Sequence, residues 1–277
     1  MRRPAMHTTH TLTVSDGVAL TLHGWTTPGA ATALFYFHGI QSHAGWLWET
    51  GPELNARGID VYALDRRGSG RSAGLRGHLP SAGLVLGDYT RALEAVAERV
   101  GGSGPVALGQ SLGGSVLTAL WCTRELPVRR LVLCAPALGQ QRARHTRAAL
   151  TERRARTGTT PQPVSLDDGD YTGLPRYREF MAADPLMLRE VTAATQATLV
   201  RLEDLYATGT PHTPLRVDLA VPEHDPIIDL RAARAALRRL TSDVHEEVFA
   251  ADKHYLEFTE ARTAYWDWLA LRLKEDG

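Results

Sequence analysis

Residues 105–121 read PVALGQSLGGSVLTALW, a run that places one serine between glycines at the junction of two apolar segments. The residues before the serine are typical of a buried strand, and those after it are typical of a helix. Glycines at positions 109 and 113 relieve the crowding that side chains would cause where a strand turns sharply into a helix. We therefore expect Ser111 to project from the apex of this turn at the carboxyl end of a sheet.

The same alternation of strand and helix runs through most of the chain. Strand-like runs lie at 9–14, 18–25, 32–39, 59–65, 105–110, 128–136, 215–221 and 245–250. Helical patterns lie at 44–58, 84–102, 111–126, 229–240 and 258–273. This order predicts an α/β fold with a mostly parallel sheet and helices on both faces. The first two strands, joined by a hairpin turn at residues 15–17, make the sheet mixed.

The alternation stops between about Leu138 and Pro214. This part has helical patterns at 142–156 and 177–209, separated by a loop, and no strand-like run. The sequence therefore predicts an α/β core made of residues 1–138 and 214–277, with a helical insertion at 139–213.

Composition excludes several classes of partner. The 31 basic and 31 acidic residues give a formal net charge of zero, which favours neither nucleic acid nor an anionic membrane surface. The N-terminus lacks the apolar segment of a signal peptide, and no run reaches the roughly 18 apolar residues needed to span a bilayer. Cys122 and Cys134 both lie in apolar surroundings and are expected to be buried thiols. We expect a soluble, cytoplasmic chain without stable membrane insertion.

A nucleophilic serine needs a base, and His254 is the best placed of the eleven histidines. It follows the last strand-like run and precedes the final helix, so we expect it at the same sheet edge as Ser111. The others that we weighed lie in an N-terminal segment expected to be ragged, on the charged helix of the insertion, or at the start of a strand: His7, His10, His145 and His245.

The base in turn needs an orienting carboxylate, and Asp225 is the leading candidate. It ends a strand-like run and precedes a proline, which biases it towards an extended loop conformation. Asp229 is better explained as the N-cap of the next helix. Glu223 and Asp252 are weaker rivals. The resulting chain order of serine, aspartate and histidine is expected when these residues cap successive strands of one parallel sheet.

Two backbone amides are candidates to bind an oxyanion beside the serine. The N–H of Leu112 lies at the start of the predicted helix. In FYFHGIQSH (35–43), Gly39 permits a tight turn that would let the N–H of Ile40 face the serine, although the same residues also suit a plain strand-end turn. The chain lacks both the GxxxxGK[ST] and HExxH patterns, so we expect neither a cofactor nor a metal.

Five motifs in order resemble a known family. They are FHGIQSHAGW, DRRGSGRSAGLRGH, LGQSLGG, EHDPIID and KHYLEF, at residues 37–46, 65–78, 108–114, 223–229 and 253–258. Together they resemble the α/β-hydrolase superfamily and, within it, the monoacylglycerol lipase and lysophospholipase-like serine hydrolases of the serine aminopeptidase S33 type. The resemblance spans nearly the whole chain and is weak in the insertion. It implies an α/β-hydrolase fold.

The resemblance also implies a role for each candidate residue. Ser111 would be the nucleophile, His254 the base and Asp225 its orienting acid. Ile40 and Leu112 would supply the oxyanion-binding amides.

The insertion at 139–213 would form a cap, or lid, over this site. The chain departs from the group at two places. Gln110 stands where histidine is common, which is expected to change the packing below the serine. Pro222 and Glu223 stand where a glycine is usual, close to Asp225.

The leading hypothesis is a serine hydrolase that cleaves a carboxylic ester or thioester of a small to medium acyl group through an acyl-enzyme. One alternative is an acyltransferase or cyclase that delivers the same acyl group to an alcohol or amine. A second alternative is a ligand-binding protein on the same fold. A cofactor-free haloperoxidase has no specific feature in its favour.

Residues 142–156 carry six arginines and one glutamate. Such a run is typical of a solvated helix face. It would also suit a site for an anionic acyl donor, such as an acyl carrier or a coenzyme A thioester, in which Arg153 and Arg154 would act. This stretch lacks the continuous apolar face of a lipase lid, which disfavours hydrolysis of bulk lipid. The apolar positions of 187–205 are expected to pack inward against the pocket.

Overall fold

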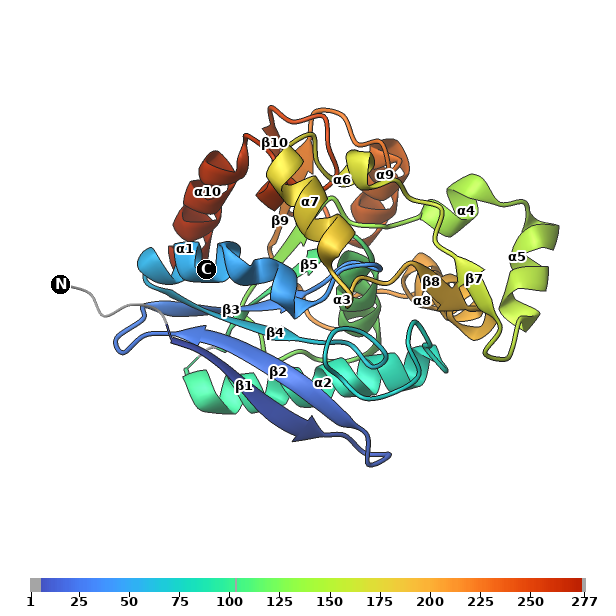
Figure 1. Ribbon diagram of the computed structural model, residues 1–277, viewed down its shortest axis with the longest axis horizontal. Helices are drawn as coiled ribbons and strands as arrows, with labels where there is room; N and C mark the ends of the chain where they lie inside the picture. Colours follow the sequence, from blue (N-terminus) through green and yellow to red (C-terminus); the bar gives the residue numbers. More distant parts are fainter. Residues whose placement is uncertain (1–5, 103, 276–277) are drawn as a thin grey trace.

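The central sheet contains both parallel and antiparallel strands. The computed structural model describes residues 6–102 and 104–275, and eight strands of these residues form one sheet in the order β1-β2-β4-β3-β5-β6-β9-β10 (Figure 1). The strands are β1 (Met6–Thr13), β2 (Ala19–Thr26), β3 (Thr32–Phe37), β4 (Ile59–Leu64), β5 (Val106–Gln110), β6 (Leu131–Cys134), β9 (Val217–Pro222) and β10 (Val244–Phe249). The β1–β2 and β2–β4 pairs are antiparallel, and the other five pairs are parallel. The predicted mixed, mostly parallel sheet is confirmed.

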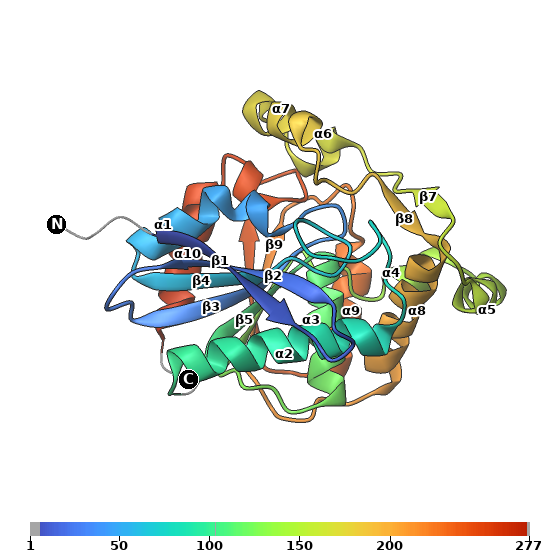
Figure 2. The same cartoon turned by 60° about the horizontal axis from the view of Figure 1, so that its bottom comes forward.

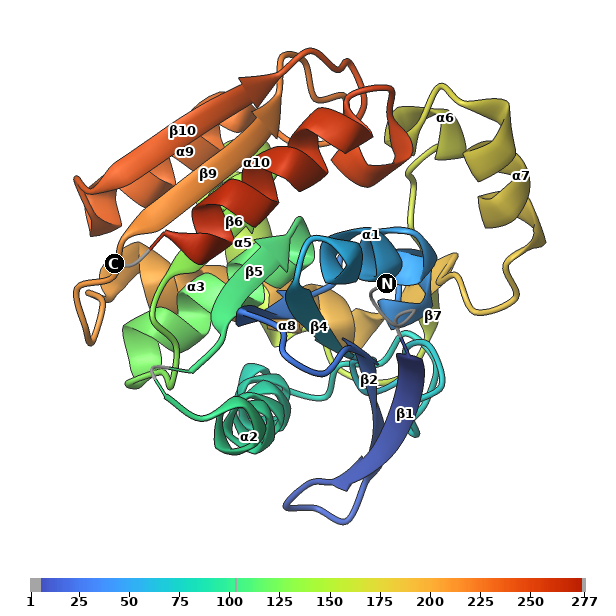
Figure 3. The same cartoon turned by 90° about the vertical axis from the view of Figure 1, so that its left-hand side faces the viewer.

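Helices cover both faces of this sheet, as predicted. On one face lie α1 (Thr50–Ala56) and α10 (Arg262–Lys274), and on the other lie α2 (Ala82–Val100), α3 (Leu112–Thr123) and α9 (Leu230–Leu240) (Figure 3). Two short 3-10 helices, η1 (Ala44–Trp48) and η2 (Leu256–Phe258), precede α1 and α10.

Strand β3 shows why the central strands are apolar without a break. Phe35 and Phe37 pack into the core under α2 and α3, whereas Leu34 and Tyr36 pack into the core under α1 and α10. Successive side chains of a strand point to opposite faces, so a strand covered on both sides needs apolar residues at every position. The adjoining α9 begins where the sequence predicted, because the Asp229 carboxylate accepts hydrogen bonds from the backbone at positions 231 and 232.

The insertion is less regular than the sequence suggested. It contains α4 (Gln140–Arg144), α5 (Arg147–Ala155), β7 (Pro161–Pro163), α6 (Asp168–Tyr171), α7 (Pro175–Ala183), β8 (Glu190–Thr192) and α8 (Ala193–Thr208). In Figures 1 and 2, α4, α5, β7, β8 and α8 lie towards the right of the molecule, and α6 and α7 lie along its upper side. The prediction that this part has no strands was wrong, since β7 and β8 pair antiparallel. Three-residue strands are too short to show the alternation that identifies a strand in a sequence.

Two predicted helices of the insertion are also divided. The pattern at 142–156 breaks at Thr146, whose hydroxyl accepts from the N–H of Ala149 and caps α5. The pattern at 177–209 is interrupted by β8, after which the Thr192 hydroxyl accepts from the N–H of Thr195 and caps α8. The first break occurs at a threonine, whose side chain competes with the helix for backbone groups. The second begins where α7 ends at Ala183, just before Asp184 and Pro185, because a proline disfavours helical backbone in the residue before it.

Three further predictions concern the N-terminal segment, the two cysteines and membrane-spanning helices. His7 and His10 lie inside β1, so the prediction of a ragged segment at these positions was wrong. Their strand is held by pairing with β2, and the ring of His7 stacks on Trp25. Cys122 and Cys134 are buried and unbridged, as predicted. In the described part of the chain, every helix is too short or too polar to cross a membrane.

Candidate active site

The turn at Ser111 has the geometry that its glycines suggested. Ser111 lies between β5 and α3 with φ 51° and ψ −119°, a left-handed conformation that is costly for any residue with a side chain. A Cβ at position 113 would overlap the carbonyl of Phe37, and one at position 109 would lie 2.6 Å from Cα of Gly114. Only glycine fits at these two positions, so the chain holds Ser111 in a strained turn above the sheet.

The fold brings His254 and Asp225 together from two different loops. Nδ1 of His254 lies 2.8 Å from Oδ2 of Asp225, and both side chains are almost completely buried. The other oxygen, Oδ1, accepts the backbone N–H groups of Ile227 at 2.8 Å and Ile228 at 2.9 Å. These three contacts fix the carboxylate and leave Oδ2 to the imidazole. The network assigns the proton to Nδ1 and leaves the lone pair on Nε2.

The rival carboxylates lie elsewhere. Asp229 caps α9, and Glu223 and Asp252 are exposed to solvent. Among the described residues, Asp225 is the carboxylate that hydrogen-bonds to His254. The loop that carries Asp225 differs from the family pattern at Pro222 and Glu223, and the contact between acid and imidazole forms despite this difference.

Gln110 contacts the imidazole, which the sequence did not suggest. Its Nε2 lies 3.2 Å from Nε2 of His254, close enough for the amide to donate to the imidazole lone pair. In the described structure, the hydroxyl of Ser111 makes no hydrogen bond to His254. The expectation that Gln110 changes only the packing below the turn was therefore wrong. The side chain is long enough to reach past the turn, and the sequence gives no signal for its direction.

A buried guanidinium holds the loop that carries Ile40. Arg66 donates from Nη1 to the carbonyl of Gly39 and from Nη2 to the carbonyl of Ile40, each at 3.1 Å. The carbonyl of Gly39 also accepts from Nδ1 of His38 at 2.9 Å. In a trans peptide the N–H points away from the preceding carbonyl, so these bonds direct the N–H of Ile40 away from Arg66.

His38 takes part in this arrangement as a neutral ring. Burial lowers its pKa well below the usual value, and the charge of Arg66 lowers it further. The neutral imidazole donates from Nδ1 to Gly39 and accepts at Nε2 from the backbone N–H of Arg66 at 3.1 Å. Sequence reasoning missed both positioning residues. The signal was an ionisable residue next to glycine at each of two strand ends, HG and RRG.

Ser111, Ile40 and Leu112 line one cavity of about 260 Å³. Part of its wall comes from the core, including Ile227 and Ile228, which follow Asp225. The rest comes from the insertion, including the apolar side chains Val164, Leu166, Val191 and Leu199. The expectation that the apolar positions of 187–205 face the pocket is thus confirmed at Val191 and Leu199. The polar side chains of this wall include Gln141, Arg153, Gln196 and Glu203.

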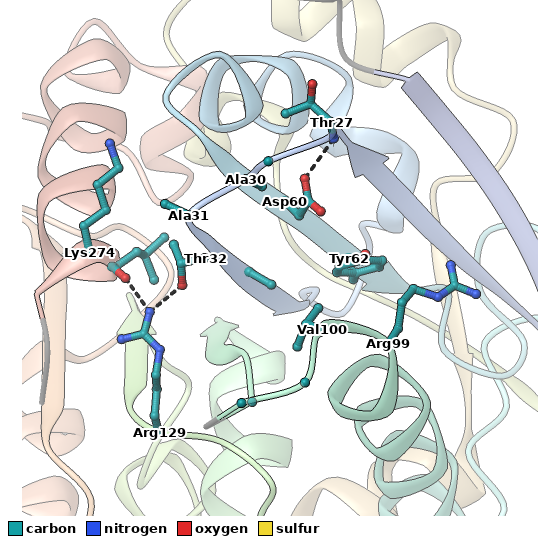
Figure 4. Close-up of a pocket in the computed structure, with 16 residues that line it drawn as sticks. Thr27, Ala30, Ala31, Thr32, Asp60, Tyr62, Arg99, Val100, Arg129 and Lys274 are labelled. Atoms are coloured by element: carbon teal, nitrogen blue, oxygen red, sulfur yellow. Dashed lines mark hydrogen bonds between the residues drawn. The ribbon is translucent and has the colours of Figure 1, made fainter.

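A larger hollow of about 870 Å³ lies elsewhere, beside the ends of α2 and α10 (Figure 4). Asp60 accepts the backbone N–H of Thr27 there at 2.9 Å, and Arg129 donates to the hydroxyl of Thr32 and the carbonyl of Leu273. The described part of its lining contains no serine, cysteine or histidine. Its described lining therefore offers no serine or cysteine paired with a histidine, and the smaller cavity, which contains Ser111, is the candidate active site.

A buried carboxyl, that of Glu257, follows His254 by three residues. Oε1 of Glu257 accepts from the hydroxyl of Tyr36 at 2.7 Å. Burial raises the pKa of Glu257 to about 7, although the hydrogen bond from Tyr36 opposes this shift.

Nowhere in residues 6–102 and 104–275 do three or more metal-ligating side chains cluster as a metal site would require.

Comparison with known proteins identifies the family of this chain. Residues 29–260 match the family model described as "Serine aminopeptidase, S33". The chain belongs to this family. The matched range includes Ser111, Asp225 and His254. The resemblance inferred from the five sequence motifs is confirmed.

Two curated relatives match over part of their length. Protein YnbC of Escherichia coli K12 is 36% identical over 133 residues, which are 46% of this chain and 23% of YnbC. A monoacylglycerol lipase of Mycolicibacterium smegmatis is 35% identical over 102 residues, 36% of each chain. The matches therefore cover well under half of these relatives.

Solved structures establish the fold. Monoacylglycerol lipase from Paleococcus ferrophilus superposes with a TM-score of 0.77 at 21% identity, covering 92% of this chain and 98% of that one. A soluble variant of monoglyceride lipase from Saccharomyces cerevisiae gives 0.79 at 13% identity, covering 98% and 95%. The predicted α/β-hydrolase fold is confirmed.

Proposed function

We propose that this protein is a serine hydrolase that cleaves a carboxylic ester or thioester of a small to medium acyl group through an acyl-enzyme. One observation carries the proposal. Ser111 stands in a strained left-handed turn and shares a cavity with Ile40 and Leu112, and its chain neighbour Gln110 contacts the imidazole of the Asp225–His254 pair. Backbone strain at Ser111 costs free energy, and the glycines on both sides leave the room that this conformation requires. A serine with only a structural role would not require such strain.

The proposed chemistry follows from these contacts. Nε2 of His254 takes the proton of the Ser111 hydroxyl as Oγ bonds to the carbonyl carbon, and the carbonyl oxygen becomes an oxyanion. The N–H groups of Ile40 and Leu112 bind that oxyanion. Asp225 stabilises the imidazolium. The imidazolium then returns its proton to the leaving alcohol or thiol as the bond to the carbonyl carbon breaks, which leaves the acyl group on Ser111.

Water completes the cycle by the reverse roles. Nε2 removes a proton from water, the hydroxide attacks the acyl carbon, and the proton passes to Oγ as the acid leaves. During both steps Nε2 must be free to accept a proton. The amide of Gln110 donates to this atom in the resting structure, so it must give way when substrate binds.

We also propose that residues 139–213 act as a cap on a core of residues 1–138 and 214–277. Three hydrogen bonds between the two parts support this proposal. Asp184 of the insertion accepts from Nε2 of His43 at 3.0 Å and from Nε1 of Trp46 at 2.8 Å. Gln41, next to Ile40, donates to the carbonyl of Leu188 at 2.9 Å. The insertion is thus tied to the loop that carries a proposed oxyanion donor.

The size of the cavity favours short substrates. Its volume of about 260 Å³ falls below the range of roughly 300–1,000 Å³ typical of sites for drug-sized ligands. Since relatives and structural neighbours include monoacylglycerol lipases, a short-chain monoacylglycerol is one ester to test.

An acyl carrier or a coenzyme A thioester is a second donor class, proposed from the arginines of 142–156. Fewer of these arginines are available to bind an anionic donor than the sequence suggested, because Arg142 and Arg154 both pair with Asp204. A cytoplasmic location is proposed on the two unbridged thiols, since disulfides form in oxidising compartments.

A fluorophosphonate probe tests the proposal. We expect it to label Ser111, and we expect Ser111→Ala and His254→Ala to abolish labelling, while turnover of 4-nitrophenyl butyrate falls by about three orders of magnitude or more. Gln110→Leu should be labelled faster than the natural chain, because the amide no longer competes for Nε2.

Circular dichroism shows whether each variant is folded. A folded natural chain that is not labelled would favour a ligand-binding protein. Product analysis with added alcohol or amine separates a hydrolase from an acyltransferase or cyclase.

A further inference from the structure

Two polar atoms in the wall of the Ser111 cavity have no partner. Nε of Arg153 and Oε1 of Gln141 are both buried and, in the described part of the chain, neither makes a hydrogen bond. Both residues belong to the insertion and line the cavity. A buried polar atom without a partner costs free energy, and most such atoms in proteins are satisfied. Their presence together in a cavity indicates that a bound molecule completes them.

Arg153 differs in this respect from its neighbours on the insertion. Arg154 binds the carboxylate of Asp204 through Nε at 2.6 Å, and Arg156 pairs with Glu152 at 3.3 Å. Arg153 has no ion pair with any described residue. Adjacent residues of a helix point in different directions, so α5 presents Arg154 to α8 and Arg153 to the cavity.

The other charged groups of the wall already have hydrogen-bond partners. Both oxygens of Glu203 accept hydrogen bonds, from the backbone N–H groups of Gln141 at 2.8 Å and Arg142 at 2.9 Å, and Arg142 adds an ion pair at 3.2 Å. Arg144 has no ion pair with a described residue, but it donates to the side chain of Gln140 and to the carbonyl of Ile227. Among the described charged groups of this wall, the guanidinium of Arg153 is therefore the one that has neither an ion pair nor a hydrogen bond.

We propose that the substrate of this site carries an oxyanion group, either a carboxylate or a phosphate, which binds Arg153 while the ester carbonyl lies at Ser111. The inference rests on the proposed hydrolase function. A planar guanidinium binds such groups through two parallel N–H donors, and partial burial strengthens the attraction. Gln141 accepts a hydroxyl or N–H of the same molecule. The apolar side chains Val191 and Leu199 contact the carbon atoms between the two ends.

Matched pairs of esters test the proposal. The carboxylate pair is 4-nitrophenyl hemiglutarate and neutral 4-nitrophenyl valerate, which have the same chain length. The phosphate pair is 1-butyrylglycerol 3-phosphate and 1-butyrylglycerol. We expect the natural chain to favour an anionic member by about ten- to a hundredfold in kcat/KM, the contribution of a hydrogen-bonded charge pair. The pair that shows the preference identifies the group.

Two variants assign the preference to its residue. Arg153→Met should bring the ratio of anionic to neutral kcat/KM close to one. Arg147→Met removes the same charge from an exposed position at the start of α5 and should keep the ratio of the natural chain. The proposal is overturned if the natural chain shows no anionic preference, or if the preference survives in Arg153→Met.

A binding measurement separates this inference from the proposed function. Calorimetry with monomethyl glutarate and the Ser111→Ala chain should give an affinity at least tenfold higher than with Ser111→Ala/Arg153→Met. Equal affinities overturn the inference whatever the turnover. If the neutral esters are hydrolysed and the anionic esters are not preferred, the inference is overturned and the proposed function stands. Absence of both hydrolysis and fluorophosphonate labelling overturns the proposed function, and the binding result then decides the inference by itself.

Discussion

The sheet side of the Ser111 cavity and its cap side differ in how their polar groups are satisfied. On the sheet side, the carboxylate of Asp225 and the carbonyl of Gly39 each accept hydrogen bonds from more than one donor. On the cap side, Arg153 and Gln141 each leave a buried atom without a partner. Nε of Arg66 on the sheet side is also buried without a partner, but both Nη groups of Arg66 donate hydrogen bonds, whereas the guanidinium of Arg153 makes none with a described residue. We infer that the sheet side is organised before substrate arrives and that a ligand completes the cap side. Preorganised groups suit chemistry, and unsatisfied groups suit recognition.

Asp225→Asn should have the largest effect on the sheet side. The Ile227 and Ile228 amides would hold the carbonyl oxygen of the new side chain and turn its NH₂ group to Nδ1 of His254. That group donates, so the imidazole would carry its proton on Nε2 and could not accept one from Ser111. We expect kcat to fall by about 10³- to 10⁴-fold, measured with 4-nitrophenyl butyrate.

Asp229→Asn is the matched control, because it removes a nearby charge and asparagine caps helices as well as aspartate does. We expect it to keep the kcat of the natural chain. An unchanged kcat in Asp225→Asn would show that the ordered sheet side does not carry the chemistry.

Glu257→Gln should alter stability in a pH-dependent way. The folded-state pKa of about 7 lies above the usual 4.5, so between these values the folded chain keeps a proton that the unfolded chain has lost. The stability that comes from the neutral carboxyl is present below pH 4.5 and is lost as pH rises through 7. Between pH 5 and pH 8 the natural chain should lose about 1 to 3 kcal/mol relative to Glu257→Gln.

Urea unfolding at the two pH values measures this difference. Glu260→Gln, at an exposed position close by, should show the pH dependence of the natural chain. Parallel stability curves for the natural chain and Glu257→Gln would mean that Glu257 is ionised throughout, and that the sheet side contains a charge where we infer a neutral group.

Asp204→Asn should have the smallest effect, and it tests the cap side. Asp204 pairs with Arg142 and Arg154, and all three side chains are about one-third exposed. Ion pairs of this exposure contribute about 1 kcal/mol or less. Urea unfolding should show a loss of that size, and kcat for 4-nitrophenyl butyrate should stay within about threefold. A large loss of turnover would show that the cap, too, is organised for the chemistry.

The sequence predicted the sheet, its order of strands and helices, and the residues that approach one another at its edge. These features depend on local signals: apolar runs, glycines where a side chain would clash, and caps such as Asp229. The insertion was predicted less well. Its strands are three residues long, and its helical patterns break at Thr146 and ahead of Pro185, so the hydrophobic period carries little information there.

Contacts over long sequence separation decided the rest of the site. The run at 142–156 has a strong local excess of arginine, yet Glu203 and Asp204 from α8 compensate part of it. Arg153 and Arg154 are equivalent in the sequence, and only packing of α5 against α8 sends one to the cavity and the other to Asp204. The contact of Gln110 with His254 spans 144 residues and could not be inferred from either neighbourhood.

By itself, the sequence determined that Ser111 stands in a sharp turn. Glycines at positions 109 and 113 leave room where a strand turns directly into a helix. The sequence also predicted that Asp225 and His254 lie at one edge of the sheet, because their places after successive strands follow from chain order. The tertiary structure alone decided that Arg153 faces the cavity and that Arg154 pairs with Asp204. Charge compensation depends on distances of a few ångströms, and only the folded chain fixes those distances.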